Sequence, residues 1–523
     1  MRAELGRVRE VRIGSLRLWL APGVDPRVAI APDGDPDRLL TRPETRLVKL
    51  QKKVMVGRGP TPVGPLYVKR YTVHAWRVAL GSIVTASPAR RAFEAARRLA
   101  ALGFGVPDVV AGVDDRRAGF LRRSFFVTHE VPGAATADRY WRGLAGRPRE
   151  RRRFAHALGD LFRRLHAAGV YHNDLKDVNV LVREDAGRLH LVLLDLERVH
   201  VGRVPGRRRR IKNLVQLERT LGRTASAAAR ARLLRAYLGP EAGRQERHAW
   251  AAAVLAAAAR KERRRPARGA APRAAIGVAC AVVCQDEAAQ IGACLDSVDW
   301  CDEVVVVDGG SRDATVAIAH QHTSRVLHNS WPGYRAQKQV ALEAATQPWV
   351  LSLDADERVT PELVSQIRTA LASVPDGVDG FAIPRLVPYL GRFWYRGGWW
   401  PRPRIRLVRR TRAAWGGVDP HDRLEVRGAV RRLYAPILHY TYPDIAGHLR
   451  SVGHLTAVAA AQVAPGRRVG LARLLAEPLW RFVRAGVLRG GLREGTPGFF
   501  VSATDAFSVF LRWARVWERA RRV

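Results

Sequence analysis

Hydrophobic residues in the second half of the chain follow the rhythm of alternating strands and helices. Residues 276–283 and 303–307 are short, nearly continuous apolar runs, and residues 291–298 between them have helical spacing. Short apolar runs of this length are typical of strands buried on both faces. Their alternation with a helix predicts a parallel sheet covered by helices. We therefore expect an α/β domain over residues 275–445.

The first half has a different pattern. Residues 66–71 alternate like a half-buried strand, residues 88–102 have the 3.6-residue period of an amphipathic helix, and residues 189–194 resemble a buried strand. We find no internal repeat. The chain therefore predicts an α+β domain over residues 1–240, unrelated to the second domain and joined to it by an Ala/Arg-rich helix and linker over residues 241–274.

The C-terminal residues 446–523 predict an amphipathic helical region. Aromatic residues recur there with helical spacing from Phe499 to Trp517, and Arg512, Arg515 and Arg519 flank them. Such a helix can lie in a membrane interface, or it can pack on its own domain. Since no apolar run approaches the roughly 18 residues that span a bilayer, we expect any membrane contact to be peripheral.

Composition agrees with a globular protein of two domains. The chain has 523 residues, of which 47% are hydrophobic and 26% charged. Its four cysteines, Cys280, Cys284, Cys294 and Cys301, lack the Cys-x-x-Cys spacing of zinc sites, which favours buried free thiols. Without a disulfide framework or a recognisable signal peptide, the expected compartment is the reducing cytosol.

The charge balance is strongly basic. Lys and Arg number 89 against 48 Asp and Glu, which gives a net charge of +41. Nucleic acid, an anionic membrane and a phosphorylated glycolipid would all attract such a chain, and GC-rich coding alone also enriches Arg. No nucleic-acid-binding motif accompanies the charge, so we expect no nucleic-acid partner.

Carboxylates follow two of the predicted strands of the second domain. Asp308 ends the run from Val304 and precedes two glycines, and Asp354-Ala-Asp356 ends the apolar run from Trp349. Ligands bind at such strand ends in open α/β sheets. Two carboxylates this close can reach one hard cation, which would neutralise a departing nucleotide diphosphate.

From residue 276 to about 371 the sequence resembles the family 2 glycosyltransferases with a GT-A (Rossmann-like) fold. The resemblance rests on Cys284-Gln-Asp-Glu287, the Asp308 turn and the Asp-Ala-Asp-Glu-Arg run. With Trp331-Pro-Gly-Tyr334, it extends to the lipopolysaccharide core glucosyltransferases. It implies that Glu287 and Asp308 contact the nucleotide and that Asp354 and Asp356 handle the diphosphate and Mg²⁺ or Mn²⁺. Asp286 stands where that family usually has Asn.

Inversion at the sugar carbon needs a base for the acceptor hydroxyl. Asp422 stands where relatives have a His-Glu or His-Asp pair, so we assign it that role, against the alternative of a solvated loop carboxylate. Lys338 and Arg335 are candidates for the diphosphate or ordinary surface charges, and His421 is a ligand or a structural histidine. The Trp-rich residues 393–401 are either core aromatics or a platform for the acceptor sugar.

The first domain carries a different motif. His172-Asn-Asp174-Leu-Lys-Asp-Val-Asn179 has the His-x-Asp-x₄-Asn spacing of a kinase catalytic loop, in which the Asp deprotonates the hydroxyl and the Asn holds Mg²⁺. Asp195 follows at a strand end, where kinases place a second metal ligand. Lys69 fits the strand lysine that binds ATP phosphates, and Glu94 its ion-pair partner.

From about residue 66 to 221 the chain resembles lipopolysaccharide kinases of the Kdo and heptose kinase type, including the stretch from Arg210 after the metal aspartate. The resemblance implies ATP and Mg²⁺ as substrate and cofactor. Only Gly57-Arg-Gly59 remains of a Gly-rich loop, and Asn173 replaces the arginine of regulated protein kinases. A pseudokinase that only binds glycolipid is therefore the alternative to an active kinase.

Together these features predict a bifunctional enzyme of lipopolysaccharide inner-core synthesis. One domain would transfer a hexose, with UDP-glucose as the expected donor, and the other would phosphorylate a core Kdo or heptose with ATP. The shared glycolipid acceptor explains the fusion, and the basic charge suits an anionic leaflet. We expect the enzyme on the cytoplasmic face of the membrane, as a peripheral protein.

Overall fold

The computed structural model describes residues 8–31, 34–51, 53–73, 81–82, 85–223, 225–263, 276–419, 421–464, 467 and 469–521. The chain divides into two compact units, of which the first comprises residues 1–40 and 51–268 and the second residues 41–50 and 269–523. Each unit has a hydrophobic core of its own.

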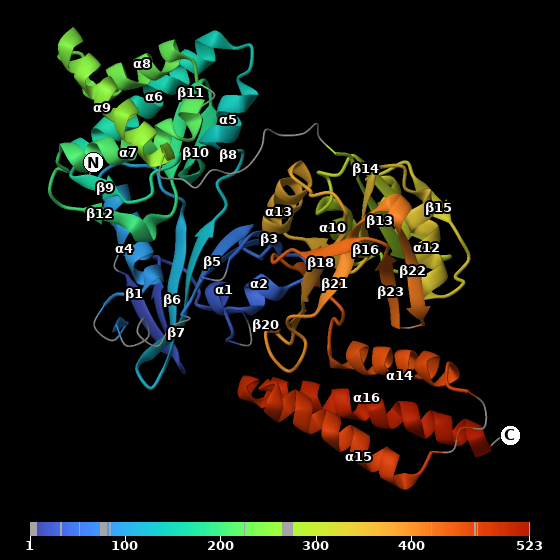
Figure 1. The fold of residues 1–523 in the computed structure, drawn as a ribbon. Helices are drawn as coiled ribbons and strands as arrows, with labels where there is room; N and C mark the ends of the chain where they lie inside the picture. Colours follow the sequence, from blue (N-terminus) through green and yellow to red (C-terminus); the bar gives the residue numbers. More distant parts are fainter. Residues whose placement is uncertain are drawn as a thin grey trace. The chain divides into compact units, whose positions relative to one another are not determined.

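An antiparallel sheet begins the first unit, with strands in the order β1-β2-β6-β7-β5-β4 (Figure 1). The predicted strand over residues 66–71 is β5, and the predicted helix over residues 88–102 is α4, which Ser87 caps by accepting a hydrogen bond from the backbone N–H of Arg90. The elements are β1 (Arg9–Ile13), β2 (Leu16–Leu20), α1 (Arg27–Ile30), α2 (Arg38–Thr41), β4 (Val54–Gly59), β5 (Leu66–Thr72), α4 (Pro88–Ala101), β6 (Val109–Arg117) and β7 (Phe120–His129).

The remainder of the first unit is mainly helical. The Ala-rich stretch forms two helices because Gly239, with φ +91°, ends α8 before Pro240. The basic segment continues α9 to Arg263, and the rest of the predicted linker lies outside the described residues. The elements are β8 (Ala135–Thr136), α5 (Ala137–Gly143), α6 (Pro148–Ala167), β9 (Val170–His172), η1 (Asp177–Asn179), β10 (Val180–Asp185), β11 (Arg188–Leu193), η2 (Leu196–Arg198), β12 (Val199–Val201), α7 (Arg207–Glu218), η3 (Leu221–Arg223), α8 (Ala227–Leu238) and α9 (Arg244–Arg263).

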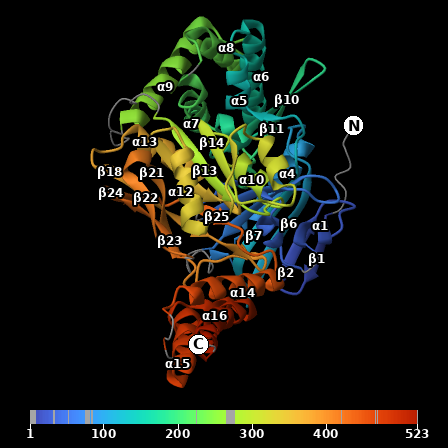
Figure 2. The ribbon, with the colours of Figure 1, turned by 90° about the vertical axis from the view of Figure 1, so that its right-hand side faces the viewer.

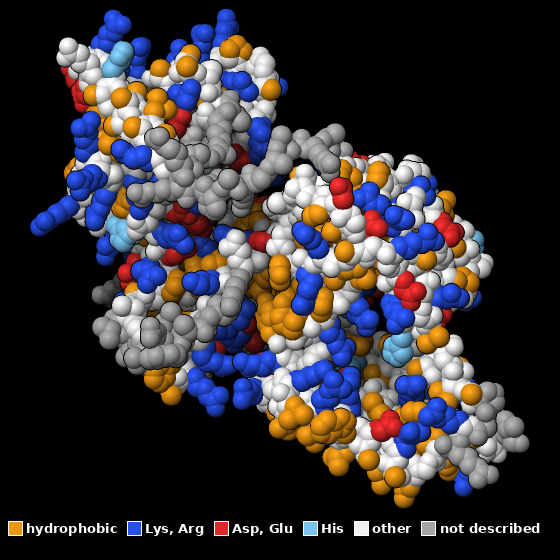
Figure 3. All heavy atoms as spheres, in the orientation of Figure 1, with side chains coloured by type: hydrophobic (Ala, Val, Ile, Leu, Met, Phe, Trp, Pro, Cys, Tyr) orange, Lys and Arg blue, Asp and Glu red, His pale blue; other side chains and the backbone are white. Residues whose placement is uncertain are grey.

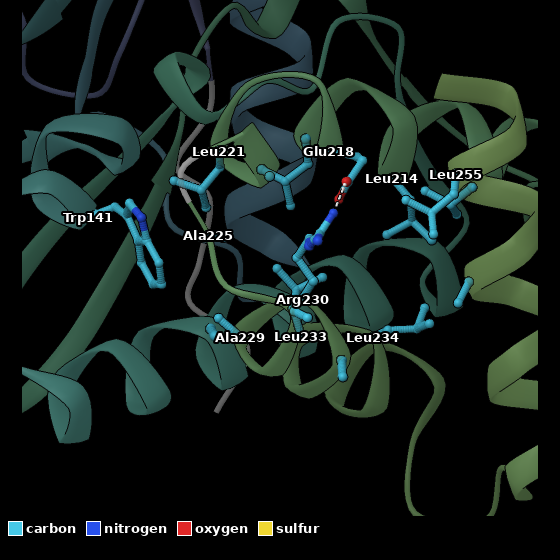
Figure 4. A pocket seen from close by; sticks show the side chains of 17 residues that line it. Trp141, Leu214, Glu218, Leu221, Ala225, Ala229, Arg230, Leu233, Leu234 and Leu255 are labelled. Atoms are coloured by element: carbon cyan, nitrogen blue, oxygen red, sulfur yellow. Dashed lines mark hydrogen bonds and ion pairs between the residues drawn. The ribbon is translucent and has the colours of Figure 1, made fainter. Parts of the chain in front are cut away.

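An apolar pocket of about 230 Å³ lies among these helices. In Figure 4, leucine and alanine side chains of α7, α8 and α9 surround it, and Glu218 and Arg230 point toward each other, 2.8 Å apart. None of the predicted kinase residues lines this pocket. It is therefore separate from the chemistry that the sequence indicates for this unit.

The second unit is built on a mixed sheet with strands in the order β15-β14-β13-β16-β21-β18-β25-β17, and β24 pairs with β18. The strands β15, β14, β13 and β16 are parallel, as predicted, whereas β21 runs antiparallel to β16. The elements are β3 (Arg46–Leu50), β13 (Val278–Cys284), α10 (Ile291–Asp296), β14 (Glu303–Asp308), α11 (Thr315–His320), β15 (Val326–His328), α12 (Tyr334–Ala344), β16 (Trp349–Asp354), β17 (Glu357–Val359), α13 (Pro361–Ala372), β18 (Val378–Leu386), β19 (Pro388–Tyr389), β20 (Arg392–Phe393), β21 (Pro403–Arg409), η4 (Arg410–Arg412), β22 (Ala413–Val418), β23 (His421–Val426), β24 (Ala429–Arg432) and β25 (Ile437–His439).

Three helices complete the second unit and lie side by side in Figures 1 and 2. The last of them, α16, contains the predicted aromatic helix. Its Arg515 and Arg519 donate hydrogen bonds to the carbonyls of Gly453 and Ala461. These two arginines therefore fasten α16 to its own unit. The elements are α14 (Ile445–Ala461), α15 (Leu471–Phe482), the π-helical turn η5 (Val483–Leu488), η6 (Gly491–Glu494) and α16 (Thr496–Arg521).

Candidate functional sites

The strand ends of the second unit bring its predicted carboxylates to one edge of the sheet. Cys284, the last residue of β13, is in register with Asp308 on β14, and Val283 is in register with Asp354 on β16. The two aspartates therefore flank the end of β13 on opposite sides. This is the edge at which α/β sheets bind ligands.

Asp354 lies between two buried cations. Its Oδ1 is 2.9 Å from Lys338 Nζ and its Oδ2 is 2.9 Å from Arg406 Nη2. Burial opposes ionisation of Asp354, but Lys338 and Arg406 outweigh it and hold its pKa well below the usual range. The carboxylate is therefore charged whenever the protein is folded near neutral pH.

Lys338 also joins Asp354 to the predicted base. Its Nζ lies 3.0 Å from Asp422 Oδ2. Burial alone would lower the pKa of Lys338, but the attraction of Asp354 and Asp422 keeps it raised. The structure thus gathers Lys338, Asp354 and Asp422 in one cluster, whereas His421 and Arg335 are exposed.

Asp356 has a partner that sequence reasoning missed. Its Oδ2 lies 3.2 Å from Nε2 of His439, the last residue of β25. Glu357, next in the motif, is fully buried; it accepts the backbone N–H of Asp354 and pairs with Arg406. The Asp-Ala-Asp-Glu-Arg run thus contains two partly exposed carboxylates, Asp354 and Asp356, and one fully buried carboxylate, Glu357.

Asp308 and its turn hold the neighbouring loop. Asp308 is buried and accepts hydrogen bonds from the backbone N–H groups of Gly310 and Ser311. Asp286 adopts φ +55° and accepts the N–H of Arg312. Asn and Asp are the residues that tolerate this backbone conformation, and both offer the accepting oxygen. Asp at position 286, where the family usually has Asn, therefore keeps the same backbone conformation and the same hydrogen bond.

Glu287 lies where these carboxylates converge. Burial raises the pKa of Glu287 to about 7, and the negative charges of Asp356 and Asp354 add to the effect. Such mutual repulsion is what a bound cation would relieve. Among the described residues, no three His, Cys, Asp or Glu side chains form a complete metal site, so a cation here would need oxygen ligands from substrate or water.

A Glu287→Gln variant should reveal this repulsion as a gain in stability. The pKa of Glu287 is raised in the folded state, so the ionised form is penalised above pH 7 and no penalty remains below about pH 4.5. We expect the variant to be more stable by up to about 3 kcal/mol at pH 8 and equal to the wild type near pH 4.5. Urea unfolding followed by tryptophan fluorescence at both pH values would measure this. Glu343→Gln, at an exposed position on α12, is the control, and an equal gain there would contradict the explanation.

In the first unit, the predicted catalytic loop is held by its own backbone and by α7. His172 Nδ1 accepts the N–H of Asp174, and its Nε2 donates to the carbonyl of Leu194. Asn213 donates to the carbonyl of His172 and Gln216 to that of Asn173. The two α7 residues lie in the stretch that carried the resemblance, but their contacts could not be read from it.

Asn179 and Lys176 both contact Asp174 within the loop. Asn179 donates to the backbone carbonyl of Asp174 at 2.7 Å, and Lys176 Nζ lies 2.8 Å from the Asp174 carboxylate. Leu194 donates to the carbonyl of Asn179, which sets Asp195 beside it. Asp195 has φ +56° and forms an ion pair of 2.5 Å with Lys69.

The predicted pairing of Lys69 with Glu94 is wrong. Lys69 Nζ lies 2.9 Å from Glu197, whereas Glu94 is 44% exposed and pairs with Arg90 one turn earlier on α4. The buried face of α4 is formed by Phe93, Ala96 and their neighbours, and Glu94 is not on it. The turn at Asp195 instead brings Glu197 to the lysine.

This correction predicts opposite effects for two glutamates. Glu197→Gln should raise the dissociation constant for the ATP analogue by about tenfold or more, because Lys69 loses a buried charged partner. Glu94→Gln should leave it within about twofold, because its ion pair with Arg90 is exposed. Titration with a fluorescent ATP analogue would measure both, and a larger effect at Glu94 would restore the original assignment.

Three of the four cysteines, Cys280, Cys284 and Cys294, are buried free thiols, as predicted, and Cys301 is partly buried.

The Trp-rich segment contains both core and exposed residues. Phe393 and Trp394 are core residues, whereas Tyr395 is 43% exposed. No helix in the described part of the chain is long and apolar enough to cross a bilayer.

Two family models match the chain. The lipopolysaccharide kinase (Kdo/WaaP) family matches residues 51–237, and glycosyl transferase family 2 matches residues 280–431. A lipopolysaccharide core biosynthesis glycosyltransferase of Rhizobium meliloti, LpsC, is 30% identical over 247 residues, which are 46% of this chain and 91% of the relative. An uncharacterized glycosyltransferase of Rickettsia felis is 29% identical over 257 residues, 45% of this chain and 88% of the relative.

Solved structures are similar at lower identity. WaaP in complex with acyl carrier protein is 22% identical, with a TM-score of 0.37, and covers 47% of this chain and 98% of WaaP. Glucosyl-3-phosphoglycerate synthase from Mycobacterium tuberculosis, in complex with Mg²⁺ and uridine diphosphate, is 17% identical, with a TM-score of 0.25, and covers 36% of this chain and 78% of that one.

Proposed function

Since the chain belongs to the lipopolysaccharide kinase (Kdo/WaaP) family through its first unit and to glycosyl transferase family 2 through its second, we propose that it modifies one core glycolipid twice. The second unit would transfer a hexose, with glucose from UDP-glucose as the expected donor. The first would phosphorylate a Kdo or heptose with ATP. The observation that carries the proposal is the cluster of Lys338, Asp354 and Asp422 at the strand ends of the second unit.

In the transferase, the residues around Asp354 suit a nucleotide diphosphate. Asp354 and Asp356 supply the hard oxygen ligands that Mg²⁺ or Mn²⁺ prefers, and His439 lies beside them. Such a cation, when bound, stabilises the negative charge of the leaving diphosphate. Lys338 and Arg406 add fixed positive charge at the same place, and Asp422 would accept the proton of the acceptor hydroxyl.

In the kinase, Asp174 would orient and deprotonate the acceptor hydroxyl. Asn179 and Asp195 would hold Mg²⁺, which neutralises charge on the transferred phosphoryl group. Lys69 would bind the ATP phosphates, and Glu197, 2.9 Å from its ammonium group, would hold it in place.

A non-catalytic first unit is the second candidate. The ion pair between Lys69 and Asp195 favours it, because each side chain then binds the other instead of ATP or Mg²⁺. The lack of a Gly-rich loop favours it as well. In that case the unit would only bind the glycolipid. An Asp174→Asn, Asp195→Asn double variant would then leave the product unchanged.

The proposed contact with the membrane is made by α15 and the turn after it. Leu471, Leu475 and Leu479 are one turn apart and 60–70% exposed, and Val487 and Leu488 continue the apolar surface. Figure 3 shows hydrophobic side chains gathered on these C-terminal helices with Lys and Arg beside them. An apolar face bordered by arginines fits an anionic bilayer on the cytoplasmic side, where ATP and nucleotide sugars are present.

Liposome sedimentation tests this surface. A Leu475→Glu, Leu479→Glu variant should bind phosphatidylglycerol vesicles at least about tenfold more weakly, because two leucines no longer enter the bilayer. Leu449→Glu, at an exposed leucine of α14, is the matched control. Equal losses in both variants would contradict the assignment to α15.

The masses of the reaction products test the proposed function. The protein is incubated with truncated lipopolysaccharide, ATP and a panel of nucleotide sugars, and the products are weighed. We expect one hexose increment and one phosphate increment, which are removed separately by variants of the two units. If neither increment appears on any core acceptor, the proposal is wrong.

A further inference from the structure

A basic pocket of about 410 Å³ lies in the second unit, apart from the carboxylate cluster. The loop after β20 and the turn after η5 form it. Its lining consists of three arginines, two aromatic residues, a glycine and a proline: Arg396, Arg402, Arg489, Tyr395, Trp400, Gly398 and Pro401. None of these residues has a role in the function proposed above.

The pocket has an excess of positive charge. Arg396 shares Glu494 with Arg392. Within the described parts of the chain, no carboxylate lies within ion-pair distance of Arg402 or Arg489. Arg402 is exposed at the pocket. Its partial desolvation and the nearby Arg481 and Arg489 lower its pKa, and Asp505 opposes them. An anion would relieve this repulsion.

Arg489 approaches the loop that follows β20. Gly398 adopts φ +85°, and the guanidinium of Arg489 lies on the side of it where a β-carbon would stand. The N–H of Gly397 donates to the carbonyl of Arg489 at 3.1 Å. The backbone of Arg489 is thus held against the loop, while its side chain is exposed at the pocket.

The two aromatic rings give the pocket an apolar wall. Tyr395 and Trp400 pack edge to face, with ring centroids 5.6 Å apart. Their neighbours Phe393 and Trp394 belong to the core. Tyr395, which is exposed, and Trp400, which is partly buried, can therefore contact the apolar face of a sugar ring, while the arginines bind its charged substituent.

Arginines connect the pocket to the cluster around Asp354. Arg402 precedes β21, which carries Arg404 and Arg406, and the pairing of β21 with β18 skips Arg406 at a β-bulge between Ile405 and Leu407. Arg406 binds Asp354 directly. Four residues of extended chain place Arg402 at most about 13 Å from Arg406. A saccharide of more than one ring could thus reach from the pocket to the transfer site.

We propose that this pocket binds an anionic substituent, a phosphate or a carboxylate, of the acceptor saccharide while another of its sugars receives the hexose. The inference rests on the proposed sugar transfer and names the acceptor subsite for it. Bidentate arginine contacts with an oxyanion, beside a stacking ring, are the chemistry that would recognise such a group.

Acceptor kinetics of the full chain test the subsite. Arg402→Ala and Arg489→Ala should each raise the KM for phosphorylated core lipopolysaccharide by about 10- to 100-fold, with little change in kcat. Arg402→Lys should recover only part of the affinity, because lysine lacks the bidentate fork. Arg493→Ala, at an exposed arginine beside the pocket but not in its lining, should behave as wild type.

Chemically altered acceptors identify the anion. If a phosphate is bound, the penalty of Arg402→Ala disappears on acceptor dephosphorylated with hydrogen fluoride; if a carboxylate is bound, it disappears on carboxyl-reduced acceptor. The same penalty on both acceptors, or none on the native one, would overturn the subsite.

If the wild type transfers no sugar at all, the proposed function has failed. Calorimetric titration with delipidated, phosphorylated core oligosaccharide then tests whether the pocket binds the saccharide. Weaker binding by Arg402→Ala than by the wild type supports the subsite, and equal binding rejects it.

Discussion

The Asp356→Asn variant is expected to lose sugar transfer by about 10²- to 10³-fold while it still phosphorylates the acceptor. Asp356 is partly exposed and its side chain pairs with His439, so the change removes a charge at the proposed diphosphate site and leaves the buried pairs of Asp354 and Glu357 intact. Hexose and phosphate increments, measured on one acceptor preparation, would show the loss of one and the retention of the other.

Asp354→Asn is a less specific test of the same site. Asp354 neutralises Lys338 and Arg406, both of which are almost fully buried. Removing one partner of a buried ion pair costs several kcal/mol, so this variant should lose stability as well as activity. Thermal unfolding separates the two cases: Asp356→Asn should unfold near the wild-type temperature and Asp354→Asn well below it. Wild-type sugar transfer by Asp356→Asn would contradict the assignment of Asp356 to the site.

Asp354 and Asp356 differ in their partners, and these partners could not be predicted from the sequence. Apolar runs ending in carboxylates predicted that Asp308 and Asp354 lie at strand ends, and β14 and β16 confirm it. The partners of Asp354 could not be predicted in this way. Lys338 and Asp422 are 84 residues apart, and β21, which carries Arg406, follows no periodic signal that joins it to β16.

The local sequence motifs also did not show in which direction individual side chains point. The order of Lys69, Glu94 and Asp195 matched a kinase, but helical rotation points Glu94 to solvent, and Glu197 takes its place. Helix α15, which the aromatic period of α16 did not point to, exposes Leu471, Leu475 and Leu479, and α16 itself exposes several of its aromatic residues. For Lys69, tertiary packing decided which of two plausible glutamates lies beside it. The alternating arginines from Arg402 to Arg406 do not mark one face of β21, because a β-bulge at Arg406 interrupts the alternation.

The Asp174→Asn variant is expected to lose phosphate transfer by about 10²- to 10⁴-fold, the usual contribution of a general base. The backbone of Asp174 is held by contacts that do not depend on its charge, although its carboxylate pairs with Lys176. His172 accepts its backbone N–H, and Asn179 binds its backbone carbonyl. Asparagine should therefore occupy the same place without the ability to take the proton, and the loss should be chemical rather than structural.

Radiolabelled phosphate transfer from ATP to truncated lipopolysaccharide measures this loss, with sugar transfer by the same preparation as the internal standard. Asp185→Asn, at an exposed carboxylate on the β10–β11 hairpin, is the matched control and should remain active. Full phosphorylation by Asp174→Asn would reject Asp174 as the base. If neither wild type nor variant transfers phosphate while both bind the glycolipid, the ion pair between Lys69 and Asp195 belongs to a binding module. The two units would then act on the same glycolipid through one catalytic site instead of two.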